Sequence, residues 1–129
     1  MENVKVAMYM RLARANNIAF YCRVAHADAD ALAAQERHLL DYAEDNGYED
    51  GKFNKHCVYR DNGGSGSTLD RPGMNMLMAD IRDGRVDVLI VKDISRVLRN
   101  YIKLDGWFRF LKKHGVVFIS VNDGIHGLA

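Results

Sequence analysis

The sequence predicts an α/β fold with three layers, in which helices cover both faces of a mostly parallel central sheet. Strand-length apolar runs alternate with helical patterns along the 129-residue chain, and such alternation is typical of parallel strands joined by covering helices. The run "VDVLIV" at 86–91 is almost continuously apolar, as a central strand buried on both faces requires. The length suits a single domain with one hydrophobic core.

The first part of the chain is expected to form a strand, a helix and a second strand. Residues 18–24 are a compact apolar and aromatic run of strand length. A helix is expected over 31–46, with Asp28 or Asp30 as its N-cap. Its apolar residues fall on one face: Leu32, Leu39, Leu40 and Ala43. A short strand is predicted around 57–60.

The second part is expected to hold two more helices and two more strands. It begins with a loop rich in Gly, Ser and Asp at 61–73. Asp70 is the expected N-cap of the first helix, and Pro72 lies in its first turn. Each helix has an apolar stripe, with Met74, Leu77, Met78 and Ile81 in the first and Tyr101, Leu104, Phe108 and Leu111 in the second. The last buried strand is expected at 116–121.

Composition limits the classes of function. The formal net charge of +1 does not support a strongly basic nucleic-acid-binding module, although local basic clusters are compatible with it. The two cysteines, Cys22 and Cys57, fit no metal spacing, so reduced, buried thiols in an intracellular, cytoplasmic protein are expected. Neither a secretory leader nor a long apolar run is present, so no membrane span is expected.

Four arginines are expected to gather at one edge of the sheet. Active groups of open parallel sheets collect beyond the carboxyl ends of the strands, which is where Arg23, the 61–71 loop and the stretch after Val91 lie. These segments contribute Arg23, Arg71, Arg96 and Arg99. A guanidinium presents a planar fork of donors that matches phosphate oxygens. Fixed cations of this kind stabilise the negative charge of a phosphoryl-transfer transition state without a metal.

A plainer interpretation of the arginines competes with this one. Asp61, Asp70 and Asp93 are close to them in sequence, and on composition alone surface ion pairs are favoured over a phosphate site. The loop also lacks the Gly-Lys-Ser/Thr ending of a phosphate-cradling P-loop. A nucleotide site is therefore not expected there, and the loop alone is typical of a flexible surface segment.

Several segments together resemble a known family. They occur in one order: "YCRV" at 21–24, Gln35, "YRDNGGSGSTLDRPG" at 59–73, "VDVLIVKDISRVLRN" at 86–100 and "GVVFISVNDG" at 115–124. This pattern resembles the N-terminal catalytic domain of the serine recombinases, the resolvase/invertase family, and most of all the large serine recombinases. The resemblance covers about 18–126. It implies a resolvase-like catalytic domain over 18–129, preceded by an N-terminal extension at 1–17.

The resemblance implies DNA strand cleavage and rejoining, in the service of DNA recombination and integration by mobile elements. In this family a serine hydroxyl attacks a DNA phosphodiester, forms a covalent phosphoserine and frees a 3′ hydroxyl. Four subunits cut both duplexes, exchange ends and reseal them by the reverse attack. The covalent bond stores the phosphodiester energy, so neither a metal nor another cofactor is implied.

The family's site residues map onto this chain one by one. By resemblance, the phosphate and transition-state ligands are Arg23, Arg71, Arg96 and Arg99. Gln35 is the implied orienting hydrogen-bond residue near the nucleophile. Ser95 occupies a phosphate-binding position at which some members have an aspartate and others a serine.

The chain departs from the family at the nucleophile. The family has arginine, any residue, serine, whereas this chain has Arg23, Val24 and Ala25. A methyl group cannot attack phosphorus, and the loss of a covalent nucleophile typically costs several orders of magnitude in rate. Strand cleavage is therefore expected to be strongly impaired or absent.

Other nucleophiles would need a new geometry. Ser65 and Ser67 lie in the Gly/Ser loop and could approach the site. Ser120 is expected inside a strand, His26 in a solvated loop, and Tyr21 and Cys22 in the packing of the first strand.

A near-copy of the first strand precedes it. "VAMYMRLA" at 6–13 repeats Ala, Tyr, Arg and Ala at the same places as "IAFYCRVA" at 18–25. The second copy is favoured as the family's first strand, because Gln35 follows Ala25 by ten residues, close to the family's usual gap. The first copy would then add an edge strand or compete for the same position. Coincidence and duplication both remain as explanations.

The implied partners follow from the family. The chain stops at Ala129, before the family's long dimer helix and DNA-binding region, which fits an excised domain or a protein that lost those parts. DNA binding by this chain alone is expected to be weak, and a homo-oligomer, dimer or tetramer, is expected in the full-length protein. No membrane and no small-molecule substrate are expected. Two alternatives are a non-catalytic pseudo-recombinase, acting as an assembly or DNA-binding regulatory module, and an unrelated small-ligand-binding domain, which the multi-segment match disfavours.

Overall fold

The structure of the chain, a computed structural model, describes residues 17–47 and 55–126. They form one five-stranded sheet in the order β2-β1-β3-β4-β5. The strands β1 (Asn17–Val24), β2 (Lys55–Asn62), β3 (Val88–Val91) and β4 (Val117–Ser120) pair in parallel. The short β5 (Ile125–His126) pairs antiparallel with β4. The predicted mostly parallel α/β sheet is thus confirmed.

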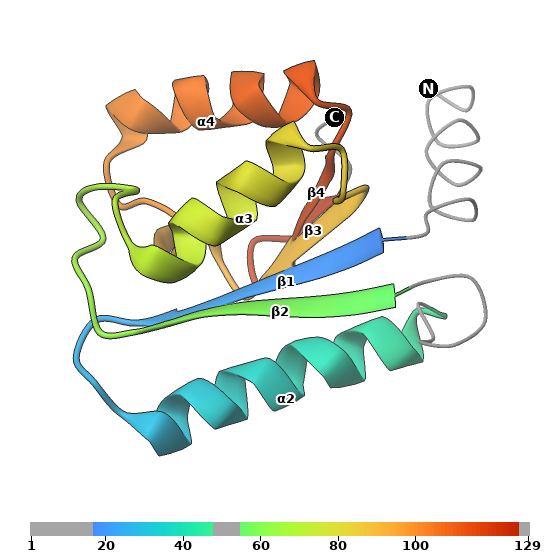
Figure 1. Cartoon of the computed structure of the whole chain (residues 1–129). Coiled ribbons are helices and arrows are strands. Elements are labelled where there is room, and N and C mark those ends of the chain that lie inside the picture. The colour runs from blue at the N-terminus through green and yellow to red at the C-terminus, as the bar shows by residue number, and fades with distance from the viewer. Residues whose placement is uncertain (1–16, 48–54, 127–129) are drawn as a thin grey trace.

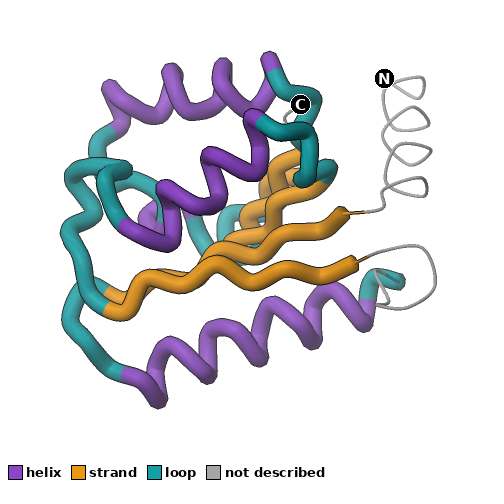
Figure 2. The backbone as a smooth tube through the Cα atoms, in the orientation of Figure 1, coloured by secondary structure: helices purple, strands orange, loops and turns teal. Residues whose placement is uncertain are grey.

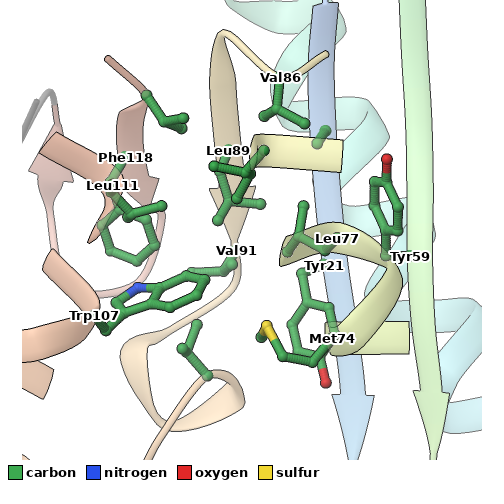
Figure 3. Packing of buried hydrophobic residues seen from close by; sticks show 14 of the residues in the cluster. Tyr21, Tyr59, Met74, Leu77, Val86, Leu89, Val91, Trp107, Leu111 and Phe118 are labelled. Carbon is green, nitrogen blue, oxygen red and sulfur yellow. The ribbon is translucent and has the colours of Figure 1, made fainter. Parts of the chain in front are cut away.

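Helices cover both faces of this sheet (Figure 1). One face carries α2 (Ala29–Asp45), and the opposite face carries α3 (Pro72–Arg82) and α4 (Tyr101–Lys113). Each face has its own buried cluster, because alternate residues of a strand point to opposite sides. On the α2 side, Phe20 and Ile90 pack with Leu39. On the α3 and α4 side, Leu89 and Phe118 pack with Leu77, Trp107 and Leu111 (Figure 3).

The predicted elements are present, with shifted ends. The first strand begins at Asn17, and the near-copy at 6–13 lies outside the described residues. Helix α2 begins two residues before the predicted start, and its N-cap is Asp28, whose Oδ1 accepts the N–H of Ala31 at 3.0 Å. The buried stripe of α4 contains Trp107, which the predicted stripe omitted, while Phe108 is only partly buried.

The cap of α3 differs from the prediction. Asp70 does not cap this helix, because its Oδ1 accepts instead from the Nδ2 of Asn75 at 3.1 Å. The cap comes from β2: Asp61 Oδ1 accepts the N–H of Gly73 at 2.7 Å, and its Oδ2 accepts that of Met74 at 3.0 Å. A carboxylate from a neighbouring strand thus satisfies the free N–H groups of the first turn, a contact that local sequence does not reveal.

Both thiols were expected to be buried, but only one of them is. Cys22 is fully buried in β1, and burial raises the pKa of its thiol to about 12. Cys57 is exposed on β2, which forms an edge of the sheet. Within the described residues, no helix is long and apolar enough to cross a membrane.

Gly73 is expected to tolerate no side chain. A Cβ at this position would lie 2.3 Å from the carbonyl oxygen of Arg60. The start of α3 is therefore so close to β2 that only glycine fits at position 73. Gly73→Ala is therefore expected to lower the free energy of unfolding by about 2 kcal/mol, the typical cost of overpacking. Urea denaturation measures this.

Gly106 supplies the matched control. It lies inside α4 and nothing is within 4 Å of a Cβ built there, so Gly106→Ala is expected to raise the free energy of unfolding by about 0.8 kcal/mol through helix propensity. Equal effects of the two substitutions would contradict the close approach of α3 to β2.

Candidate active site

The site begins at the carboxyl end of β1, where Arg23 is paired with Asp61 of β2 but has no partner strand on the β3 side. β3 stops at Val91, short of the end of β1. The carbonyl of Val24 accepts from the N–H of Gly63 on the β2 side, so the backbone groups of Arg23 point to the other side. There the Gln35 Oε1 accepts the N–H of Arg23 at 3.0 Å, and its Nε2 donates to the Arg23 carbonyl at 3.1 Å. The side-chain amide of Gln35 therefore makes the two backbone hydrogen bonds that a longer β3 would make, and it fixes the chain two residues before Ala25.

The Arg23 side chain connects β1 to two other backbone segments, the Gly/Ser loop and the 94–97 segment. Its Nε donates to the carbonyl of Arg96 at 2.9 Å, its Nη1 to that of Gly64 at 2.8 Å and its Nη2 to that of Ser95 at 2.7 Å. Arg23 is only 1% exposed. Burial, followed by the charge of Arg71, lowers the pKa of Arg23, although a guanidinium stays charged in proteins.

Arg71 repeats this role from the start of α3. Its Nη1 donates to the carbonyl of Arg96 at 3.1 Å and its Nη2 to that of Val97. The guanidinium also lies over the ring of Tyr21, 5.5 Å from the centroid. Tyr21 in turn donates its hydroxyl to Asp61 Oδ2 at 2.6 Å, and burial raises its pKa. Two buried guanidiniums thus bind the carbonyls of one segment.

The other two arginines of the cluster are more accessible. Arg96 is half-buried, donates from Nη1 to the carbonyl of Arg23 at 3.2 Å and forms a 3.4 Å ion pair from Nε to Asp93 Oδ2. Arg99 is exposed, and its backbone N–H donates to the carbonyl of Gly66 at 2.9 Å. The ion-pair interpretation of the arginines thus accounts for Arg96, whereas Arg23 and Arg71 bind backbone carbonyls.

The Gly/Ser loop closes over this cluster. A Cβ on Gly66 would lie 2.9 Å from Arg23 Nη2 and 3.0 Å from the side-chain stem of Arg99, so the glycine permits close contact with both arginines. From α4, Lys103 donates its Nζ to the carbonyl of Ser67 at 3.4 Å. Sequence reasoning missed Lys103, which lies in the first turn of α4, three residues after the quoted "VKDISRVLRN" stretch.

Ala25 lies between the end of β1 and this loop. It is partly exposed, and its carbonyl accepts the N–H of Gly64 at 3.3 Å. Figure 2 shows the loops after β1 and β2 starting together at this end of the sheet, before one turns to α2 and the other to α3. The four arginines, Gln35 and Ala25, the predicted position of the nucleophile, are therefore brought together.

The remaining hydroxyl and imidazole groups differ in burial and in partners. Ser120 is buried and donates to Asp123 Oδ2 at 2.5 Å, while the Ser95 hydroxyl donates to Asp93. The exposed residues are Ser65, Ser67, Ser95 and His26.

Asp123 is a second residue that sequence reasoning missed. Its Oδ2 accepts the N–H of Ile94 at 2.8 Å as well as the Ser120 hydroxyl. With Arg99 and Ser95 it lines an open pocket of about 310 Å³. The only signal in the sequence was its place in the quoted "VNDG" stretch. Asp123 thus anchors the segment whose carbonyls accept hydrogen bonds from the guanidiniums of Arg23 and Arg71.

Within the part of the chain that the structure describes, no group of three or more His, Cys, Asp or Glu side chains could hold a metal ion.

The fold and the site define a class: an α/β domain with a cluster of arginines at the carboxyl edge of its parallel sheet. Residues 18–128 match the sequence profile described as "Resolvase, N terminal domain". Because this match spans most of the chain, the protein belongs to the resolvase N-terminal domain family, the catalytic domains of serine recombinases.

Solved structures agree with this family. The N-terminal catalytic domain of TP901-1 integrase is 29% identical with a TM-score of 0.69, and the match covers 86% of this chain and 81% of that one. A resolvase family site-specific recombinase from Streptococcus pneumoniae is 26% identical with a TM-score of 0.69, covering 86% and 75% of the two chains. The C-terminal catalytic domain of ISC1926 TnpA, an IS607-like serine recombinase, shares the fold at 24% identity with a TM-score of 0.70, covering 81% and 69%. A search of curated proteins returned no significant match.

Proposed function

We propose that this chain is the catalytic domain of a site-specific DNA recombinase that binds a DNA phosphodiester at its arginine cluster, and that its strand cleavage is impaired because Ala25 occupies the nucleophile position. The observation that carries the proposal is the convergence of the four arginines around the 94–99 segment, beside Ala25. No metal or cofactor is part of the proposed reaction.

The arginines divide into two proposed roles. Arg23 and Arg71 hold the 94–97 carbonyls and supply positive potential from within the domain. Arg99, which is exposed, contacts the phosphate directly, with Arg96 and Ser95 beside it. The Nε of Arg71 is buried and has no hydrogen-bond acceptor among the described residues, whereas the Nε of Arg96 forms the 3.4 Å ion pair with Asp93. The positive charge of the cluster is therefore only partly neutralised by carboxylates, which favours an anion as its ligand.

The proposed partners are DNA, bound weakly by this chain alone, and further copies of the chain in a larger assembly acting in the cytoplasm. A net charge of +1 supports weak binding, since phosphate contacts dominate affinity for DNA. The second candidate is a pseudo-recombinase that binds DNA or active subunits without cutting. It is favoured by one observation, a complete arginine cluster beside a methyl group at position 25.

A salt titration of DNA binding tests the proposed site. For a labelled mixed-sequence duplex, Arg99→Ala is expected to weaken binding at low salt and to reduce the slope of log affinity against log salt by about 1, the effect of losing one phosphate contact. Arg37→Ala is the matched control, since Arg37 is an exposed arginine paired with Asp41 on α2. Identical slopes for the two variants, or no binding by the unaltered chain, would overturn the proposal.

A further inference from the structure

We propose that Ser65 is a substitute nucleophile, which attacks a phosphodiester at the arginine cluster at a slow rate in place of the missing hydroxyl at position 25. This inference rests on the proposed function, because it needs a phosphodiester bound beside Arg99. It goes beyond that function by assigning covalent chemistry to a loop serine.

The placement of Ser65 comes from its two neighbours. The carbonyl of Gly64 accepts from Arg23 Nη1 at 2.8 Å, and the N–H of Gly64 donates to the carbonyl of Ala25 at 3.3 Å. On the other side, Gly66 lies against the guanidinium of Arg23, and its carbonyl accepts the N–H of Arg99 at 2.9 Å. Ser65 is therefore held at the cluster from both sides, one residue from the group that contacts Ala25.

The Ser65 hydroxyl is exposed and already oriented. It accepts the N–H of Ser67 at 3.1 Å, and its Oγ lies 2.6 Å from the Oγ of Ser67. When Ser65 donates across this second contact, Ser67 receives the proton that a nucleophile must lose. A neutral hydroxyl is a much weaker base than the histidine or carboxylate that usually activates a serine, so this contact relays the proton and the attack is slow.

The other nucleophiles of the site are less suitable. The Cys22 thiol is buried, and its pKa of about 12 keeps it protonated. Tyr21 is buried and its hydroxyl is bound to Asp61. Ser95 is exposed and donates its hydroxyl to Asp93, so it is the main competitor of Ser65, and identification of the labelled residue decides between them. Of the exposed groups, Ser65 alone lies between two residues that contact Arg23, within the described chain.

The proposed step balances without an added reagent. The Ser65 Oγ forms a bond to phosphorus, and the bond from phosphorus to the 3′ oxygen breaks. The Ser65 proton passes through the Ser67 hydroxyl to the departing oxygen, which leaves as a 3′ hydroxyl. The 5′ phosphate remains on Ser65 as a phosphodiester, and the guanidinium of Arg99 offsets the negative charge of the transition state.

A small activated phosphodiester tests the step without knowledge of a target site. Thymidine 5′-(p-nitrophenyl phosphate) would release p-nitrophenolate and leave the thymidine 5′-phosphoryl group on the attacking residue. We expect a slow release that stops at one equivalent per chain, with the added mass assigned to Ser65 by tandem mass spectrometry. Ser65→Ala should reduce labelling to that of the urea-unfolded chain, and Ser67→Ala should slow it about tenfold or more.

The Ala25→Ser variant separates the two ways of failing. If it is labelled at position 25 while the unaltered chain is not labelled, the role of Ser65 is wrong and the proposed function stands. Labelling of the unaltered chain at Ser67, Ser95 or His26 also overturns the role of Ser65. If neither protein is labelled, the arginine cluster does not bind a reactive phosphodiester, and both proposals fall. Ser65 is exposed, so Ser65→Ala is expected to fold, which circular dichroism checks.

Discussion

Ala25→Ser is expected to raise the rate of attack on a phosphodiester by about 10³-fold or more, the scale of effect seen when a covalent nucleophile is removed from an enzyme. The surroundings of position 25 support this expectation. Gln35 fixes the backbone of Arg23 from both its N–H and its carbonyl, and Gly64 donates to the carbonyl of Ala25 itself. A new hydroxyl would therefore project from a backbone that is already positioned.

The substitution is also expected to cost little stability. Ala25 is partly exposed and follows the last residue of β1, so one added oxygen meets solvent rather than a packed core. Surface substitutions of this kind usually change the free energy of unfolding by less than about 0.5 kcal/mol. A gain in rate can then be assigned to the hydroxyl and not to altered folding.

Ala27→Ser is the matched control for the restored nucleophile. Ala27 is exposed, belongs to the same loop and lies close to Gly63. It receives the same chemical change two residues away. The initial rate of p-nitrophenolate release from the thymidine diester measures both variants. If Ala25→Ser is no faster than Ala27→Ser, position 25 is not a nucleophile position, and the pseudo-recombinase interpretation gains at the expense of the catalytic one.

The four parallel strands could be predicted because each is a local apolar run, whereas the two-residue β5 was not predicted. The apolar run at 86–91 contains β3, and the alternation of elements implied parallel pairing. The edge on which the arginines gather followed from the same reasoning, since the residues after parallel strands share one end. Arg23 and the segment after Val91 are in contact there.

The partners of the site residues were beyond sequence reasoning because they join distant segments. The 61–73 stretch suggested a cap from the adjacent Asp70, but Asp61 caps α3 across the sheet edge. Likewise, nothing local indicates that Asp123 anchors Ile94, or that Lys103 reaches the loop. Such contacts depend on tertiary placement, and hydrogen-bonding residues offer several equivalent local partners.

The resemblance implies that Arg23 contacts the phosphate, which stays a prediction, and its contacts in the structure favour an architectural role as well. A phosphate ligand needs accessible donors, whereas Arg23 is 1% exposed and donates to the carbonyls of Gly64, Ser95 and Arg96. Those carbonyls belong to the two segments that carry Ser65 and Arg99. The guanidinium therefore holds these two segments in place, and loss of its hydrogen bonds should lower the free energy of unfolding of the protein without DNA.

Arg23→Met is expected to lower the free energy of unfolding by about 3 kcal/mol. Methionine keeps an unbranched side chain but removes all three hydrogen bonds to carbonyls. The carbonyl of Arg96 retains a donor in Arg71, while those of Gly64 and Ser95 lose a partly buried bond each, and a hydrogen bond to a charged group contributes about 1.5–3 kcal/mol. Urea denaturation monitored through Trp107, the single tryptophan of the chain, provides the measurement.

Arg99→Met separates this architectural role from phosphate binding. Arg99 is exposed and contacts the loop through its backbone N–H, which the substitution keeps. The free energy of unfolding of the variant is therefore expected to lie within about 0.5 kcal/mol of that of the unaltered chain. Its loss should appear in the salt dependence of DNA binding instead, since the lost group is a cation at the surface. Were Arg23→Met as stable as Arg99→Met, the carbonyl contacts would contribute nothing measurable, and Arg23 would have to be assigned to the phosphate directly. If Arg23 is structural and Arg99 binds phosphate, Arg23→Met should cause the larger loss of stability and Arg99→Met the larger loss of salt slope.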